Sequence, residues 1–287
     1  MERVYWGTIT PETYDQAMQT YGSDPLHKTV LFGHTENLTF LLERGMSPNT
    51  TNFDCLTPLH IACMRNRIDC ARILVKYGAN INASGADGGT PLCDACAVGS
   101  ADCVHLLLQE GADVNPVLAL STPLHEACAR GSLTCVSLLI QAGAILNTND
   151  CHIGTPLHTA TLRNHFDCAR LLLQSGAPVN AVKIHETPLH IAARENHLDL
   201  ARLLLQYGAN VYASNNQNKL PIDLLQENKG PFYDLLIHYS SFPPTLKDIC
   251  RRKIRIALGS ERLKFLPDLE IPRYNLDILK ESDQDFL

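Results

Sequence analysis

Long hydrophobic runs are missing from this sequence of 287 residues. No segment approaches the ~18 consecutive apolar residues that a membrane-spanning helix requires. The first ten residues, MERVYWGTIT, have no apolar segment behind a basic start, so we expect no secretory signal. These absences predict an intracellular chain in the cytoplasm, with the nucleus left open as a second compartment and no membrane partner.

A surplus of basic residues is also missing, because 24 Lys and Arg stand against 30 Asp and Glu, a net charge of −6. Proteins whose main role is nucleic-acid binding usually carry a basic excess, so we expect no nucleic-acid partner. The sequence contains no glycine-rich phosphate loop, no GxSxG elbow and no HExxH motif. We therefore expect no catalytic residues, no metal ion and no cofactor.

The composition is that of a folded chain, with 45% hydrophobic and 19% charged residues. The 11 cysteines are many for an intracellular protein. Their odd number and the missing export signal argue against a framework of disulfides.

The dominant feature of the sequence is an internal repeat. Phrases such as TPLH recur around prolines at positions 25, 58, 91, 123, 156, 188 and 221. About 20 residues later, each unit repeats a second phrase such as LLLQEGADVN or LLLQYGANVY. The pattern resembles the ankyrin repeat, whose period is about 33 residues and whose signature is T-P-L-H-x-A. The resemblance implies an all-α repeat solenoid of about seven units, the last of them a degenerate cap.

The physical chemistry of each unit agrees with this interpretation. Thr before Pro is suited to begin a helix, and glycines such as Gly78 and Gly208 are suited to end one. Seven cysteines occupy two recurring positions, which predicts that they pack between neighbouring repeats: Cys63, Cys96 and Cys128; Cys70, Cys103, Cys135 and Cys168.

Several residues suggest metal or redox chemistry, but the repeat gives them a structural role. Cys93 and Cys96 form a CxxC pair, in which Cys93 replaces the TPLH histidine. Without a second ligand pair we expect these thiols to pack rather than bind zinc. The TPLH histidines are expected to form hydrogen bonds between adjacent repeats: His27, His60, His125, His158 and His190.

The 33-residue period stops near residue 240, where Ser240–Pro244 is predicted to be a linker. The next segment, TLKDICRRKIRIALG, has one apolar face at helical spacing and a basic opposite face. Its order of Thr245, Leu246, Cys250 and Ile254 resembles the BC box, the elongin-binding half of a SOCS box. A plain capping helix would explain the apolar face but not this order.

A second motif follows the BC box and resembles the cullin box, usually Leu-Pro-x-Pro before an apolar helix. Two alignments are possible, through Leu266-Pro267 or through Ile271-Pro272. We prefer the second, because Leu269, Ile271 and Pro272 then continue the apolar rhythm. The usual closing aromatic residue is not evident.

The chain thus resembles the ankyrin repeat and SOCS box (ASB) family over nearly its whole length. The expected domains are an N-terminal extension (1–20), an ankyrin array (21–239) and a SOCS box (240–287). Within the SOCS box, the BC box spans 245–254 and the cullin box about 266–279.

The resemblance implies a non-catalytic substrate receptor of an E3 ubiquitin ligase. The SOCS box would recruit elongin B and elongin C together with cullin-5 and its RING subunit. The ankyrin array would hold a target protein for ubiquitination and proteasomal degradation. Two alternatives remain open at this point, a plain ankyrin scaffold and a nucleic-acid-associated regulator that uses Arg251–Arg255.

The loops between repeats are the expected contacts for the target protein. The loop containing Val117–Leu120 has an unusually apolar tip, which favours a binding site, although folding back onto its neighbours is an equal alternative. The candidate residues for target binding are Phe53, Asp54, Asp87, Leu118, Leu120, His152, Lys183 and His185.

Overall fold

The computed structural model describes residues 25–117, 119–150, 154–183, 186–225 and 230–241. The chain divides into two compact units, Met1–Ala144 and Ile145–Leu287. In the described residues the regular elements are α-helices and one 3₁₀ helix, with a single isolated β-bridge between Lys183 and Glu186. No helix of the described part is long and apolar enough to cross a membrane.

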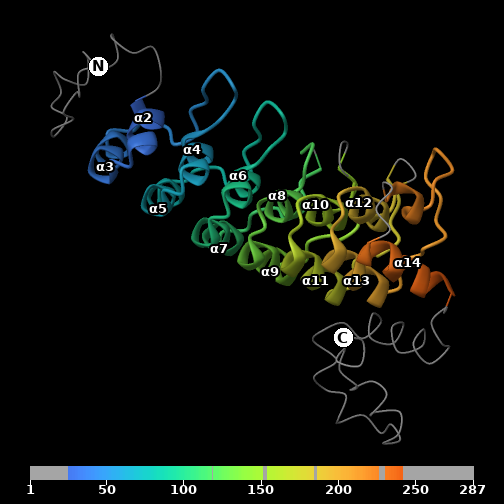
Figure 1. The fold of residues 1–287 in the computed structure, drawn as a ribbon. Helices are drawn as coiled ribbons and strands as arrows, with labels where there is room; N and C mark the ends of the chain where they lie inside the picture. The colour runs from blue at the N-terminus through green and yellow to red at the C-terminus, as the bar shows by residue number, and fades with distance from the viewer. Residues whose placement is uncertain (1–24, 118, 151–153, 184–185, 226–229, 242–287) are drawn as a thin grey trace, which may run out of the picture. The chain divides into compact units, whose positions relative to one another are not determined.

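The first unit contains four antiparallel helical pairs arranged in two layers (Figure 1). Within it, α2, α4, α6 and α8 pack successively against one another, and α3, α5, α7 and α9 form the second layer. Because each short pair has an apolar face that it cannot bury alone, stacking creates the core. The helices are α2 (Pro25–Phe32), α3 (Thr35–Glu43), α4 (Pro58–Met64), α5 (Ile68–Lys76), α6 (Pro91–Val98), α7 (Ala101–Gln109), α8 (Pro123–Arg130) and α9 (Leu133–Gln141).

The second unit repeats this arrangement until its last pair, in which a 3₁₀ helix replaces the first α-helix. This shortened element, η1, packs on α12, and α14 packs on α13. The expected degenerate last repeat is therefore present. The elements are α10 (Pro156–Leu162), α11 (Phe166–Gln174), α12 (Pro188–Arg194), α13 (Leu198–Gln206), η1 (Pro221–Leu224) and α14 (Pro231–Ser241).

The ends of the helices follow the sequence signals. Helices α4, α6, α8, α10 and α12 each begin at the proline that follows the repeat threonine. Helix α5 ends at Lys76, and Gly78 follows two residues later with a φ of +83°, which costs little without a side chain. The N–H groups of Gly78 and Ala79 donate to Val75 O and Leu74 O, both at 3.0 Å, which satisfies the last carbonyls.

The recurring cysteines are core residues, as expected. All seven are buried, and the nine cysteines within the described residues are free thiols. Burial raises the pKa of the thiols of Cys96 and Cys135, which keeps them neutral packing groups.

The first two residues of the predicted linker are helical instead. Ser240 and Ser241 belong to α14, and the Ser240 hydroxyl donates to Ile237 O at 2.9 Å. A helix can continue until the residues that precede a proline, so Pro243 does not prevent this extension.

Candidate functional site

The candidate site is the set of loops that join one helical pair to the next. In the first unit these loops project from the same side of the stack (Figure 1). The loop around Phe53 is closed by a hydrogen bond from Asn52 N to Leu56 O at 3.0 Å. The Asn52 side-chain oxygen also accepts from the N–H groups of Asp54 and Leu56, at 3.0 and 2.9 Å. The turn is therefore held by its own hydrogen bonds before any partner binds.

The next loop has the same architecture and is linked to the first. Gly85 N donates to Gly89 O at 2.8 Å, and Asp87 Oδ1 accepts from Gly89 N at 3.0 Å. Ala86 N donates to Asp54 O at 3.2 Å, which joins the two tips directly. The tips of two adjacent repeats thus form one hydrogen-bonded edge.

Four of the repeat histidines connect these loops to the helices, as the sequence predicts. Nε2 of His60 lies 3.3 Å from Gly89 O, the carbonyl of the following repeat, and His27 reaches Leu56 O at 2.8 Å. His158 and His190 make the equivalent contacts in the second unit, with Glu186 O and Lys219 O.

In His60, His158 and His190 the other ring nitrogen faces the start of its own helix. Nδ1 of His60 accepts from Thr57 N at 3.0 Å and lies 2.9 Å from the Thr57 hydroxyl. Accepting at Nδ1 leaves the proton on Nε2, so the ring is neutral. Burial lowers the pKa of His60 and of His190, which supports the neutral form. These histidines are structural groups.

Cys93 takes the place of a histidine, as predicted from its position in the repeat. Its Sγ donates to Ser121 O at 3.7 Å and accepts from the Thr90 hydroxyl at 3.5 Å. It therefore makes a weaker form of the same bridge. No group of three potential metal ligands occurs in the described residues.

A ladder of asparagines also connects the repeats, and the sequence analysis missed it. The Asn82 amide donates to Gly111 O at 3.4 Å, and its Oδ1 accepts from Asp113 N at 2.8 Å. The recurrence of Asn at this position was the available signal. The other members with a bond to the next glycine carbonyl are Asn49, Asn115 and Asn180.

Tyr212 ends this ladder. It occupies the asparagine position of its repeat, and its hydroxyl donates to Ser240 O at 2.7 Å. A longer side chain thus makes the same kind of bridge, here to α14 (Pro231–Ser241).

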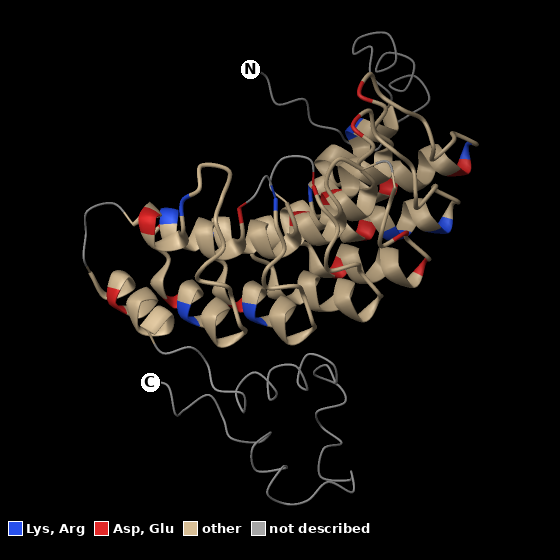
Figure 2. Ribbon diagram, turned by 90° about the vertical axis from the view of Figure 1, so that its right-hand side faces the viewer, with Lys and Arg blue, Asp and Glu red and all other residues tan. Residues whose placement is uncertain are grey.

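The first helices of the first unit carry an acidic cluster beside the loops. Burial, together with the nearby charges of Asp87 and Glu126, raises the pKa of Asp94 to about 7. Its Oδ2 is buried and has no hydrogen-bond partner. Figure 2 shows the basic residues (blue) and acidic residues (red) spread along the described ribbon.

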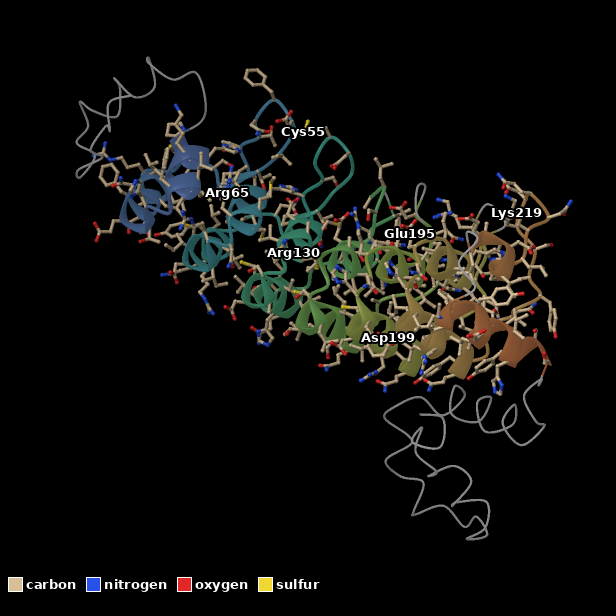
Figure 3. The ribbon with its side chains drawn as sticks, in the orientation of Figure 1. Cys55, Arg65, Arg130, Glu195, Asp199 and Lys219 are labelled. Carbon is tan, nitrogen blue, oxygen red and sulfur yellow. The ribbon has the colours of Figure 1, made fainter. Side chains whose placement is uncertain are left out.

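The structure describes five of the eight predicted target-binding residues. Phe53 is 99% exposed and Leu120 60% exposed, and Asp54 and Asp87 are exposed as well. Lys183 is half-buried, and its amine donates to Asp150 O at 2.7 Å, so part of its function is structural. Figure 3 shows Cys55, the second residue after Phe53, on the projecting loop, away from the helical layers.

The remaining predicted residues lie outside the described residues. They are Leu118, His152 and His185 of the loops; Thr245, Leu246, Cys250 and Ile254 of the BC box; and Leu269, Ile271 and Pro272 of the cullin box.

Comparison with known proteins agrees with this architecture. Models of the ankyrin-repeat family match residues 26–117, 118–183 and 185–216, and the SOCS box model matches residues 242–274. The ankyrin repeat domain of human ASB11 superposes with a TM-score of 0.71 and 34% identity, covering 78% of this chain and 100% of that domain. This chain belongs to the ankyrin repeat and SOCS box family.

Other ankyrin proteins are also similar over part of the chain. The ankyrin repeat domain of Bcl-3, a member of the IkappaB family, has a TM-score of 0.65 at 30% identity, covering 75% of this chain and 99% of that domain. The human transient receptor potential cation channel subfamily A member 1 is 49% identical over 45 residues. That match covers 16% of this chain and only 4% of the channel. The union of ankyrin repeats with a SOCS box indicates an adaptor type of protein.

Proposed function

We propose that this chain is the substrate receptor of an E3 ubiquitin ligase built from elongin B, elongin C, cullin-5 and its RING subunit. The observation that carries the proposal is the SOCS box match at residues 242–274, directly after the ankyrin repeats. The repeats hold the target protein, and the SOCS box recruits the ligase. The chain performs no bond chemistry itself, because its contribution is to hold a lysine of the target near the charged E2, which raises its effective concentration.

The elongin contact rests on a short helical motif. Leu246 and Cys250 are four residues apart in the sequence, so a helix places them one turn apart on one face. Such a pair enters an apolar pocket as a unit, with Thr245 and Ile254 at the two ends of the motif. Burying both side chains contributes roughly 3–4 kcal/mol, which corresponds to about 200–1000-fold in affinity.

The test is co-purification of elongin C with the variant Leu246→Ala/Cys250→Ala. We expect elongin C to be lost, while the circular dichroism of the ankyrin repeats stays unchanged. A matched control, Lys247→Ala/Arg251→Ala, alters the basic face of the same motif and should retain elongin C. Undiminished recovery of elongin C with the folded double variant would refute the ligase link and favour a plain ankyrin scaffold.

The target-binding part of the proposal rests on the loop tips. In the first unit Phe53, Asp54 and Asp87 are exposed on hydrogen-bonded turns, and Leu120 is exposed on the third loop. Exposed residues on loops that a rigid scaffold positions are typical of binding sites. Leu118, His152, Lys183 and His185 complete the proposed contacts. A target identified by proximity labelling should accumulate in cells in which the elongin-binding variant replaces the original chain.

A further inference from the structure

The loop tips of the first unit carry apolar side chains that the described protein leaves uncovered. Phe53 is 99%, Val117 93% and Leu120 60% exposed. A single exposed apolar residue is ordinary, but these three lie on loops that project from the same side of one unit (Figure 1). We call Phe53, Asp54, Asp87, Val117 and Leu120 the tip patch.

The patch is organised before binding. The turn that presents Phe53 is closed by the side chain and backbone of Asn52, and Ala86 N bonds to Asp54 O at 3.2 Å. Nε2 of His60 anchors the second loop through Gly89 O. An aromatic side chain on a rigid turn loses little conformational entropy when it is buried, and aromatic residues are common binding hot spots.

The charge of the patch has one sign. The three loops, residues 47–57, 79–90 and 112–122, contain three aspartates and no Lys or Arg. Glu126 on α8 adds to this negative charge, and the charges of Asp87 and Glu126 contribute to the raised pKa of Asp94 on α6. The basic residue Arg65 follows α4, and Arg130 is the last residue of α8. Both lie at the C-terminal ends of these helices, whereas the loops join the N-terminal ends.

The dimensions suit an extended chain. Neighbouring helices pack about 8–10 Å apart, so the first and third loops lie about 20 Å apart, which about six extended residues span. We propose that the tip patch binds an extended protein segment in which apolar side chains alternate with Lys or Arg. This inference deepens the proposed receptor function and rests on it, because it names the chemical class of the target segment.

The experiment measures binding of defined peptide pools to the full purified chain by fluorescence polarisation. Each pool contains fluorescein-labelled decapeptides with two fixed Leu or Phe positions, two fixed Lys or Arg positions, and Ala, Ser or Asn elsewhere. In one comparison pool Glu replaces Lys and Arg, and in the other Ser replaces Leu and Phe. We expect the basic apolar pool to bind at least tenfold more tightly than either comparison pool.

Variants connect this preference to the patch. Phe53→Ala should weaken binding about tenfold, because it removes the most exposed anchor. Asp54→Lys/Asp87→Lys should weaken it at least as much and remove the preference for the basic pool. The Phe53 side chain is 99% exposed, so Phe53→Ala should leave the melting temperature unchanged. The Asp54→Lys/Asp87→Lys variant loses the hydrogen bond from Gly89 N to Asp87 Oδ1, so circular dichroism should first show that it is folded. Two control variants away from the loops, Asp69→Lys on α5 and Leu133→Ala on α9, should bind as the original chain does.

Equal binding of the three pools, or a basic preference that survives the Asp54→Lys/Asp87→Lys variant, would overturn the inference. The assay needs neither elongin nor cullin. If the chain shows the preference for the basic pool but does not retain elongin C, the tip-patch inference stands and the ligase proposal fails. If the chain retains elongin C but shows no preference, the ligase proposal stands and the tip-patch inference fails.

Discussion

Asp94 gives the sharpest test of the structural reasoning. Its side chain lies on α6 beside Asp87 and Glu126, and its Oδ2 is buried with no hydrogen-bond partner. Burial and the two neighbouring charges raise its pKa from 3.8 to about 7. Ionised Asp94 therefore destabilises the folded chain, and Asp94→Asn should stabilise it at pH 8.

The magnitude follows from the pKa difference. One pKa unit corresponds to about 1.4 kcal/mol, so the full difference gives an upper limit of about 4 kcal/mol. Asp94 is only half-buried, and solvent screens part of the effect, which leaves about 1–2 kcal/mol as the expected gain.

The sign of the pH dependence is equally specific. The folded chain holds the Asp94 proton up to pH of about 7, whereas the unfolded chain releases it near pH 3.8. Between these values the folded state binds more protons, so the contribution of Asp94 to stability falls as pH rises. The advantage of Asp94→Asn should be full at pH 8 and should shrink as pH falls towards 4. The lowered pKa values of His60 and His190 make stability rise with pH, and they do so in both the original chain and Asp94→Asn. The difference in stability between these two chains therefore isolates the effect of Asp94.

The assay is urea unfolding followed by circular dichroism at pH 8.0 and 5.5 for the original chain, Asp94→Asn and Asp69→Asn. Asp69 is exposed on α5, so its variant should show no comparable pH-dependent gain. An Asp94→Asn chain no more stable than the original at pH 8, or a gain that is the same at both pH values, would show that the carboxyl group is well solvated.

Two further predictions concern the second unit and the SOCS box. Gly154→Ala should lower the free energy of unfolding by more than about 2 kcal/mol, because φ is +108° and a Cβ would lie 2.9 Å from the Lys183 side chain. Gly176 has a φ of +96° but open space around it, so Gly176→Ala should lower the free energy of unfolding by only about 1 kcal/mol, measured by thermal unfolding. Equal losses in the two variants would contradict the role of the Lys183 contact. Ile271→Ala/Pro272→Ala should reduce cullin-5 recovery while elongin C is retained. If Leu266→Ala/Pro267→Ala does so instead, the other alignment of the cullin box is correct.

Much of the fold was predictable because its signals are local and periodic. The threonine–proline step sets the start of α4, α6, α8, α10 and α12, and the glycine after each second helix sets its end. The cysteine and histidine positions recur with the repeat, so a single explanation applied to each. His60 and Cys93 bridge to the next repeat as their place in the period predicts.

The sequence by itself determined the repeat, the family resemblance and the candidate loops, because these depend on residues close together in the chain or on a regular spacing. Only the tertiary structure decided how each candidate side chain is used. Phe53 is uncovered, Lys183 is bonded to Asp150 O, and Tyr212 takes over an asparagine bridge. Nothing in the sequence singles out Asp94, to which α6, α8 and a loop bring burial and two like charges. Solvation and charge repulsion depend on neighbours in space, which spacing along the chain does not specify.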